Sequence, residues 1–533
     1  MQVPRLDYLW QYVEHWAAID PHFPALRYGE ETISAAELAQ TVDQTAQALL
    51  HLGVTKGDRI VTILPSIPRY VSLFLAAGKI GAITVPLDVR YRAADFRRLV
   101  PHVEPRLVIS IAGSGDNDIA ETLRSLSAEF SPDIQYYMVK AADFGTSLDA
   151  VLAQEFELDA DLQLAQASLH PDEASLLIFT GGTTGVPKAA LLSHRNIASA
   201  IYHELRLIAN ALAAQGVTGR IKTLACLPPS HVGGTVELIG TGIMGGWRMI
   251  MLDHWSPRTV LEVTQKENIP WIAGVPTMYA ILLSLPDLDQ YDLSAVKLAV
   301  LSGEKVSLEL LQGIKARICD TLINGYGSTE AGAEVTFTDP ADDLAEIAAG
   351  YVGQPLPGQE IKIVDFDDAE LPPGEEGEVL VRGPMTIKSY YKMPEEDRVG
   401  FTPDGWCRTG DLGYLTEDGG LYIKGRKKQV IRVGSYTVLP TEVESVAVQN
   451  PNVAMAAAVG VPHEIYGEVV WLAVVPQAGR NVTEDEIIQG CRQELADFKV
   501  PKRVIIAEDL PMTRLGKVDR AALVHLCGHT PVG

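Results

Sequence analysis

The chain has 533 residues, 47% of them hydrophobic and 21% charged, and this length predicts more than one hydrophobic core. Its formal net charge of −24 excludes general nucleic-acid binding, which needs a basic surface, and argues against docking on an anionic membrane by charge alone. The five cysteines are far apart and lack metal-ligand spacing, a pattern typical of free thiols in a reducing cytoplasm.

The N-terminal segment lacks the apolar core of a signal peptide. Its apolar residues recur at helical spacing between Leu6 and Trp16, which predicts an amphipathic helix. The most apolar window, residues 238–252, is short for a membrane span and contains Arg248. We therefore expect this window to lie in the protein interior.

Residues 27–110 alternate between strand and helix patterns. Helices are expected at 35–52, 69–77 and 91–99, and strands at 58–64, 82–87 and 107–110. This alternation predicts parallel strands covered by helices. No Gly-x-Gly-x-x-Gly follows the first strand, so dinucleotide binding has little support.

The string from Thr180 to Lys188, TGGTTGVPK, follows an apolar segment that predicts a buried strand. Its glycines let backbone N–H groups approach an anion, its threonines add hydroxyl donors, and Lys188 adds a positive charge, as nucleotide phosphates require. It lacks the Gly-Lys-Ser/Thr ending of the common phosphate loop, and taken alone it can also be a polar surface loop. Ser193 is predicted to cap a helix that begins near Arg195.

A second α/β region extends to about residue 351. Strands are expected at 223–227, 271–276 and 298–302, and a loop segment at 323–330. Loops at the carboxyl ends of parallel strands bind ligands in such folds, so we expect these loops to converge on one site. Short alternating segments at 360–365, 377–382 and 420–424 then predict antiparallel strands of a small barrel or sheet, and residues 429–533 form a mixed module.

In this order the motifs resemble those of the adenylate-forming (AMP-binding) superfamily, which includes acyl-CoA synthetases, aryl-CoA ligases, luciferases and adenylation domains. The resemblance covers nearly the whole chain. It implies an α/β fold, with two α/β subdomains and a small β-barrel-like subdomain in a large N-terminal domain, residues 1–427. A small, mobile α+β domain, residues 428–533, follows a hinge at Lys428.

The resemblance also implies roles for individual residues. Tyr326 would cover adenine, Thr329 would contact the α-phosphate, and Glu330 would bind Mg²⁺. Asp411 would accept hydrogen bonds from the ribose hydroxyls beside Arg426, and Lys517 would be the catalytic lysine. The residues assigned to ATP in this way are Thr180, Gly181, Gly182, Thr183, Thr184, Gly185, Lys188, Gly303, Glu304, Asn324, Gly325, Tyr326, Gly327, Asp411 and Arg426.

Residues 229–234 resemble the acyl-site segment of the family, with the catalytic-site residue His231 beside the substrate carboxylate. The implied acyl pocket comprises His231, Gly234, Val275 and Gly327. Gly233, Gly234 and Gly240 are expected to leave room, while Val236, Leu238, Met244 and Val275 are expected to line an apolar tunnel. No acidic residue precedes Glu237 in this segment, so a fatty or aryl acid is favoured over an α-amino acid.

The implied reaction needs no general base, because a carboxylate is already ionised near neutral pH. It attacks the α-phosphorus of ATP while Mg²⁺ on Glu330, the phosphate loop and Lys517 neutralise the developing charge, which gives an acyl-adenylate and pyrophosphate. In the family the C-terminal domain then rotates, and the thiol of coenzyme A attacks to give an acyl-CoA and AMP. The thiol channel would contain Gly434 and Ser435.

Three alternatives remain open at this point. Many relatives have glycine where Ser435 stands, so the acceptor can instead be the phosphopantetheine arm of a carrier protein. A noncatalytic acyl- or nucleotide-binding regulator belongs to a different class, against which the retention of Lys517, Glu330 and Asp411 speaks. A luciferase-like oxygenase is the third.

Overall fold

The computed structural model describes the chain except for short gaps, and it divides into two compact units. The described residues are 3–140, 143–154, 156, 159–180, 187–433, 436–463, 466–495, 497–512 and 518–528. The first unit comprises residues 1–361 and 380–409, and the second comprises residues 362–379 and 410–533. The boundaries between the two units fall within three strands: β19 (Glu360–Val364), β20 (Gly377–Arg382) and β21 (Cys407–Leu415).

The largest sheet of the first unit has seven strands in the order β11–β10–β4–β3–β5–β8–β9. Strands β4, β3, β5, β8 and β9 are parallel, β10 is parallel to β4, and β10 and β11 form an antiparallel hairpin. The strands are β3 (Arg59–Ile63), β4 (Ile83–Pro86), β5 (Leu107–Ser110), β8 (Gln135–Met138), β9 (Thr146–Ser147), β10 (Ala174–Thr180) and β11 (Lys188–Ser193). The predicted parallel sheet is confirmed.

Two helices in this part of the chain begin at a serine that caps them. The Ser34 hydroxyl accepts a hydrogen bond from the backbone N–H of Glu37 and starts α2 (Ala35–His51), so the helix predicted at 35–52 is confirmed. Ser193 likewise caps α8 (His194–Ala214), which begins one residue before the predicted start. The other helices of this region are α1 (Leu9–Ile19), α3 (Pro68–Lys79), α4 (Ala93–Val103), α5 (Ile119–Ser127), α6 (Leu148–Leu152) and α7 (Asp159–Ala167).

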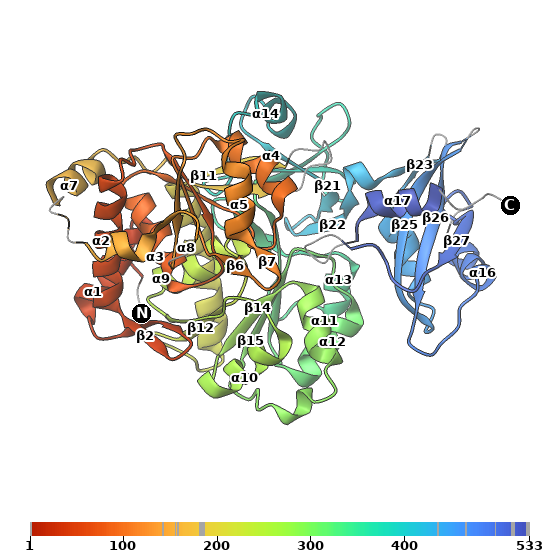
Figure 1. Ribbon diagram of the computed structural model, residues 1–533. Helices are drawn as coiled ribbons and strands as arrows, with labels where there is room; N and C mark the ends of the chain where they lie inside the picture. Colours follow the sequence, from red (N-terminus) through yellow and green to blue (C-terminus); the bar gives the residue numbers. More distant parts are fainter. Residues whose placement is uncertain are drawn as a thin grey trace. The chain divides into compact units, whose positions relative to one another are not determined.

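Two smaller sheets complete the ordered core of the first unit. One has the order β12–β13–β1–β2 and the other β14–β15–β16–β17–β18. Helices α11 and α12 lie beside each other in Figure 1 and contact each other. Their buried apolar side chains pack against the second of these sheets. The elements are β1 (Pro24–Tyr28), β2 (Glu31–Ser34), β12 (Lys222–Ala225), β13 (Arg248–Met251), β14 (Trp271–Gly274), β15 (Leu298–Ser302), β16 (Leu322–Ser328), β17 (Ala333–Phe337), β18 (Gln354–Pro355), α10 (Pro257–Glu267), α11 (Pro276–Ser284), α12 (Leu308–Arg317) and α13 (Leu344–Ala349).

Two features here differ from, or refine, the sequence prediction. β16 continues through Ser328 because residues 325–328 pair antiparallel with β17, so most of the loop segment expected at 323–330 is strand. The apolar window at 238–252 begins in a π-helix (Gly233–Gly240) and continues through α9 (Thr241–Met244), and both are largely buried. In the part of the chain that the structure describes, no helix is long and apolar enough to cross a membrane.

The second unit contains a sheet in the order β24–β23–β26–β25, with β27 beside β26. One set of its apolar side chains packs against α15 and α16, and the alternate set packs against α17. A hairpin, β21–β22, also belongs largely to this unit. The elements are β22 (Leu421–Arg426), β23 (Ile431–Val433), β24 (Tyr436–Val438), β25 (Val453–His463), β26 (Gly467–Pro476), β27 (Arg503–Ile506), α15 (Pro440–Ala447), α16 (Glu484–Glu494) and α17 (Arg520–Gly528).

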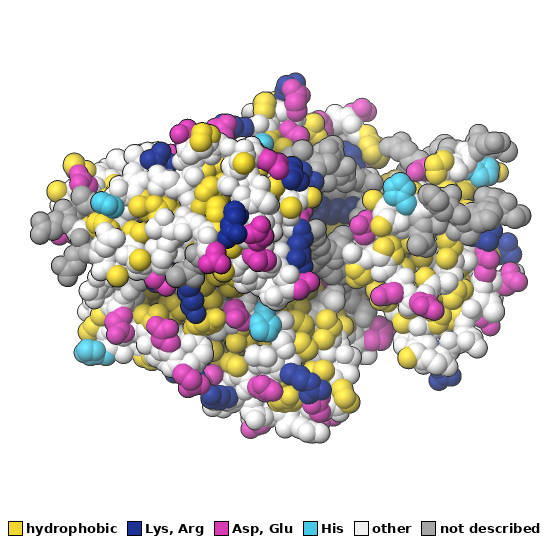
Figure 2. All heavy atoms as spheres, viewed as in Figure 1, with side chains coloured by type: hydrophobic (Ala, Val, Ile, Leu, Met, Phe, Trp, Pro, Cys, Tyr) yellow, Lys and Arg dark blue, Asp and Glu magenta, His cyan; other side chains and the backbone are white. Residues whose placement is uncertain are grey.

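The acidic net charge is not gathered at one place on the face drawn in Figure 2, where described Lys and Arg side chains are interspersed with Asp and Glu. Interspersed charges of both signs keep a strongly acidic protein from presenting one repulsive field.

The remaining described elements are the short strands β6 (Gly113–Ser114) and β7 (Asn117–Asp118) and the helix α14 (Pro394–Gly400).

Candidate active site

A carboxylate, two hydroxyls and an ammonium group from distant parts of the sequence meet at the end of β10. Thr180 Oγ1 and the Tyr390 hydroxyl each donate a hydrogen bond to Glu330 Oε1, both over 3.2 Å. Lys188 Nζ donates to the Tyr390 hydroxyl over 3.3 Å and lies 4.6 Å from the centre of its ring. These four residues are called the Glu330 network. Two of the predicted motifs, the phosphate loop and the segment at 326–330, therefore come together within the first unit.

Backbone pairing holds the members of the Glu330 network in place. Thr180 and Lys188 are partners in the β10–β11 hairpin, so the two ends of the predicted phosphate loop lie side by side. The segment that carries Tyr390 bonds to this hairpin, because the Tyr391 N–H donates to the carbonyl of Ala189 over 2.8 Å. The Ile387 N–H donates to the Glu330 carbonyl over 3.0 Å. Rigid main-chain contacts of this kind fix a site more closely than side chains alone.

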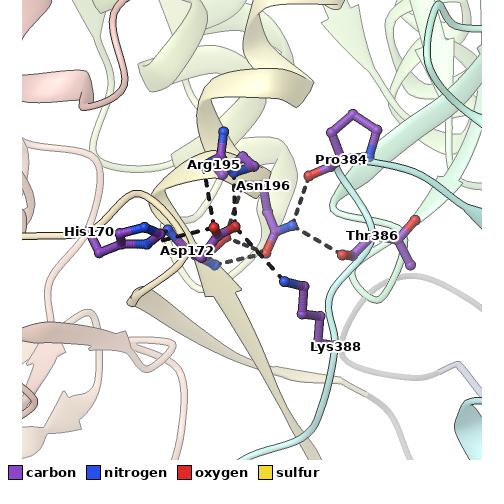
Figure 3. A network of polar contacts seen from close by, with 8 residues as sticks. His170, Asp172, Arg195, Asn196, Pro384, Thr386 and Lys388 are labelled. Carbon is purple, nitrogen blue, oxygen red and sulfur yellow. Dashed lines mark hydrogen bonds and ion pairs between the residues drawn. The ribbon is translucent and has the colours of Figure 1, made fainter. Parts of the chain in front are cut away.

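The start of α8 anchors the same segment from its other end, as Figure 3 shows. Asn196 donates through Nδ2 to the carbonyls of Pro384 and Thr386, over 2.9 and 3.0 Å. Beside it, Asp172 pairs with Arg195 at 2.8 Å and with Lys388 at 3.9 Å. The chain from 384 to 388 is thus held on both sides, shortly before Tyr390.

Burial and the charge of Glu330 both raise the pKa of Tyr390. The phenol therefore keeps its proton at any physiological pH and remains a donor to the carboxylate. Tyr390 was not predicted from the sequence. It follows no motif of its own, and only its position opposite Ala190 reveals its role.

The ends of β14 and β15 place another group of predicted residues together. Thr277 Oγ1 donates to Glu304 over 2.9 Å, and Gly303 has a φ of +86°, a left-handed conformation that favours glycine. A Cβ atom on Gly303 would lie 3.5 Å from Val275. Predicted acyl-pocket and nucleotide residues are therefore neighbours at this strand edge.

The predicted adenine segment is built on close backbone contact. The backbone N–H of Asn324 donates to Thr338 Oγ1 over 2.8 Å, which joins β16 to the end of β17. A Cβ on Gly327 would lie 2.0 Å from the Ala333 carbonyl oxygen, so only glycine fits there. Tyr326 and Thr329 are half-buried, and they retain exposed surface that a ligand can contact.

The predicted acyl-site segment is anchored from α3. Ser66 Oγ donates to the Leu227 carbonyl over 2.6 Å, and the Tyr70 hydroxyl shares a 2.6 Å hydrogen bond with Thr235. Thr235 in turn donates to the Pro229 carbonyl over 2.7 Å. His231 lies inside this anchored stretch and is half-buried.

Asp88 is a second residue that the sequence did not single out. It follows β4, and Ser230 Oγ donates to it over 3.5 Å. Burial raises the pKa of Asp88, but hydrogen bonds from the Arg90 side chain and backbone outweigh this effect and hold the pKa below its usual value, with a smaller contribution from His231. An ionised carboxylate therefore stands beside the acyl-site segment. Its place just after a predicted strand was the available signal.

The glycines of the acyl-site segment serve packing. A Cβ on Gly234 would lie 2.1 Å from the Pro228 carbonyl oxygen, and one on Gly240 would lie 2.3 Å from Ile201. The space beside these two glycines is filled by protein atoms, so the expectation that they leave room for a ligand is wrong. A Cβ on Gly233 would lie 3.3 Å from a Leu227 methyl and 3.5 Å from Glu237 Oε2.

In the second unit, the predicted ribose residues are paired with each other. Asp411 is 4% exposed, and Arg426 Nε lies 2.8 Å from its Oδ1 across the β21–β22 hairpin. Lys427 pairs with Glu378 at 2.7 Å. The other predicted residues lie outside the described residues or have undescribed side chains: Gly181, Gly182, Thr183, Thr184, Gly185, Lys428 (side chain), Gly434, Ser435 and Lys517.

The Glu330 network fits the needs of Mg²⁺. This ion prefers oxygen ligands and is usually held by one or two carboxylates together with substrate phosphates. Glu330 Oε1 is a carboxylate oxygen with two hydroxyl oxygens within 3.2 Å. Among the residues that the structure describes, no group of three or more His, Cys, Asp or Glu is arranged as a metal site, so phosphate oxygens would complete the coordination.

Comparison with known proteins decides the family. The family model of AMP-binding enzymes matches residues 13–391, and the model of their C-terminal domain matches residues 442–517. The chain belongs to the AMP-binding enzyme family. The predicted membership is confirmed.

Individual relatives extend over nearly the whole chain. The chain is 31% identical over 496 residues to a probable CoA ligase of Humulus lupulus, covering 92% of this chain and 91% of that protein. It is 30% identical to a feruloyl-CoA synthase of an Amycolatopsis species, covering 94% and 95%. The ATP-bound crystal structure of MatB from Rhodopseudomonas palustris matches with a TM-score of 0.84 at 27% identity, covering 96% and 98%. The predicted fold class, with a large N-terminal and a small C-terminal domain, is confirmed.

Proposed function

We propose that this enzyme activates a fatty or aryl carboxylic acid with ATP, releases pyrophosphate and transfers the acyl group to the thiol of coenzyme A. The Glu330 network carries the proposal, because an AMP-binding enzyme here brings a carboxylate, hydroxyl donors and a lysine to the two ends of its phosphate loop. The feruloyl-CoA synthase among the relatives supports an aryl acid.

The class of enzyme predicted from the sequence, an AMP-forming acid–thiol ligase that works with ATP, Mg²⁺ and coenzyme A, is confirmed. Family membership and the CoA-forming relatives both agree with it. The finer assignments that follow, to single residues and to a substrate, belong to the proposal.

Adenylation joins two anions, so the residues must remove repulsion and hold the reactants in line. Lys188 and the N–H groups of the phosphate loop bind the phosphates of ATP, and Thr329 contacts the α-phosphate. Mg²⁺, when bound by Glu330 and the phosphates, neutralises the charge that develops on them. Tyr390 and Thr180 fix the orientation of the Glu330 carboxylate. His231 lies beside the substrate carboxylate, which needs no base because it is already ionised.

The second half-reaction assigns roles to residues of the C-terminal part of the chain. Asp411 holds the ribose, with Arg426 as its neighbour at 2.8 Å. The domain boundary lies at 427/428, where Lys428 acts as the hinge, so that Lys517 serves adenylation and then withdraws. Gly434 and Ser435 line the channel of the incoming thiol. A cytoplasmic location is also part of the proposal, since ATP and coenzyme A are available there.

The test is ATP–pyrophosphate exchange with a panel of fatty, aryl and amino acids, followed by thioester detection with coenzyme A or a holo-carrier protein. We expect exchange with at least one fatty or aryl acid and a thioester of coenzyme A. A thioester formed only on the carrier protein would show that the carrier, and not coenzyme A, is the acceptor. Exchange with α-amino acids alone would show that the substrate is an amino acid and not a fatty or aryl acid. Absence of exchange with every acid would contradict the proposal and favour a noncatalytic regulator.

A further inference from the structure

Three glutamates from separate elements lie together beside the predicted acyl-site segment. Glu204 belongs to α8, Glu237 to the π-helix and Glu334 to β17. Helix α8 contacts both the π-helix and β17, and the π-helix contacts β17 as well. Glu204 and Glu334 are only 4% and 7% exposed, whereas Glu237 is half-buried. These residues are called the glutamate cluster.

The cluster faces residues that the proposed function places around the acid. Glu237 Oε2 lies 3.5 Å from the position a Cβ on Gly233 would take, two residues after His231. Glu334 is the β-sheet partner of Gly327, and its carboxyl carbon lies 3.2 Å from the Cβ position of Gly325. The partly exposed member of the cluster is thus the one nearest the acyl-site segment.

One carboxyl oxygen in this cluster is buried without compensation. Glu204 Oε2 has no hydrogen-bond partner among the described residues, although a carboxyl oxygen removed from water normally has one. Burial raises the pKa of Glu204, and the charge of Glu334 raises it further, to about 8. Burial and the charges of Glu204 and Glu334 also raise the pKa of Glu237. Carboxyls arranged in this way need a positive charge or must keep protons.

The geometry also bears on whether a metal ion or an organic cation would compensate these carboxyls. In the described chain no three acidic or histidine side chains have the arrangement of a metal site, and this applies to the cluster too. Of the three glutamates only Glu237, which lies next to the acyl-site segment, keeps partial exposure. A charge that is part of the acid substrate would reach it from there.

We propose that the glutamate cluster is a subsite for an organic cation, so that the preferred acid carries an ammonium or amidinium group remote from its carboxylate. This inference rests on the proposed function and makes its substrate class narrower. It differs from recognition of an α-amino acid, because Glu237 is the first acidic residue after His231 and the other two glutamates lie deeper. The cation would donate charge-assisted hydrogen bonds to these carboxylates, which an acid without a cationic group cannot do.

Pairs of acids with the same shape and different charge test the proposal. Suitable pairs are 4-(aminomethyl)benzoate with 4-ethylbenzoate and 6-aminohexanoate with heptanoate, compared by kcat/KM in ATP–pyrophosphate exchange. We expect the cationic member of at least one pair to be favoured by about 10-fold or more. Between pH 6.5 and 8.5 its KM should fall as pH rises, because the cluster loses protons, while the KM of the neutral member stays constant.

Substitutions locate the effect. Glu204→Gln and Glu237→Gln should remove the preference for the cationic acid and retain exchange with the neutral one, which also shows that the variants fold. Glu262→Gln, an exposed residue of α10, is the matched control and should leave the preference intact. Equal or better use of the neutral member of every pair by the unmodified enzyme would overturn the inference while the proposed function stands. A preference that both variants keep would overturn it as well, whereas no exchange with any acid would refute the proposed function itself.

Discussion

The first unit contains two polar groupings, the Glu330 network and the glutamate cluster, which differ in how their carboxyl groups are compensated. In the Glu330 network a single carboxylate is partly exposed, accepts two hydroxyl hydrogen bonds and has Lys188 close by. In the glutamate cluster three carboxyls lie together, and burial and neighbouring carboxyl charges raise the pKa values of Glu204 and Glu237. Under the proposed function the first arrangement binds a metal and phosphates, whereas the second holds carboxyls that need protons or a cation. The difference predicts that substitutions near Glu330 affect every acid alike, whereas those in the cluster affect only charged ones.

The largest acid-independent loss is expected for Lys517→Ala. This change should lower ATP–pyrophosphate exchange about 10²–10³-fold with every acid, because one fixed positive charge at the developing transition state is removed. Thioester formation from supplied acyl-adenylate should remain. Lys502→Ala, an exposed lysine of the same module, is the control and should change neither half-reaction. Equal loss of both half-reactions would contradict the assigned role.

Glu330→Gln sharpens the contrast with the cluster. It keeps the shape of the side chain and removes its charge, so we expect roughly 10²-fold slower exchange and a higher Mg²⁺ requirement with both members of an isosteric acid pair. A Mg²⁺ titration of the exchange rate measures both effects. A loss confined to cationic acids would erase the distinction between the two groupings.

Tyr390→Phe should have a smaller effect of the same kind. The change deletes only the hydroxyl that donates to Glu330 and accepts from Lys188, so exchange should fall about 10-fold, as for a hydrogen bond to a charged group. The adjacent Tyr391→Phe is the matched control, since its hydroxyl makes no contact with Glu330 in the structure. Identical rates for the two variants would show that Tyr390 has no positioning role.

Asp411→Asn examines the nucleotide side from the second unit. We expect an increase of about 10-fold in KM for ATP with the order of acid preferences unchanged, because the ribose hydroxyls lose a charged acceptor. The measurement is exchange at varied ATP with several acids. An altered acid preference, or an unchanged KM, would argue against ribose binding.

The smallest expected effect concerns stability and belongs to the cluster. Burial, with the charge of Glu334, raises the pKa of Glu204 to about 8, so the folded state keeps a proton that the unfolded chain releases near pH 4.5. The free energy of unfolding should therefore fall as pH rises from 4.5 to 8, and Glu204→Gln should flatten this decline by at least about 1 kcal/mol. Urea unfolding at pH 5 and 8 measures it, with Glu262→Gln as control. Parallel curves for Glu204→Gln and the unmodified protein would contradict the assignment.

Local signals made much of the fold predictable. Ser34 followed by Glu37 marks the start of the helix at 35–51, and Ser193 marks the start of α8. The motifs at 180–188 and 326–330 were recognisable because their chemistry is concentrated in a few consecutive residues. The contact between Thr180 and Glu330, which the convergence of the loops predicted, is present.

Other features depend on contacts between residues far apart in the sequence. Glu204 and Glu334 are separated by 130 positions, and nothing in either local sequence marks a shared environment. Tyr390 lies in a segment without periodicity, and its place is set by the pairing of Tyr391 with Ala189. The sequence suggests that Gly234 and Gly240 leave room for a ligand, but it does not show which protein atoms fill the space beside a glycine.

The most direct test of the central claim is an experimental structure with Mg²⁺ and a non-reactive acyl-adenylate analogue bound. We expect the phosphate at the Thr180–Lys188 loop, Mg²⁺ on the Glu330 carboxylate, the ribose on Asp411 and the acyl group beside His231, pointing toward Glu237. A nucleotide bound elsewhere, with Glu330 still bonded only to Thr180 and Tyr390, would contradict this expectation.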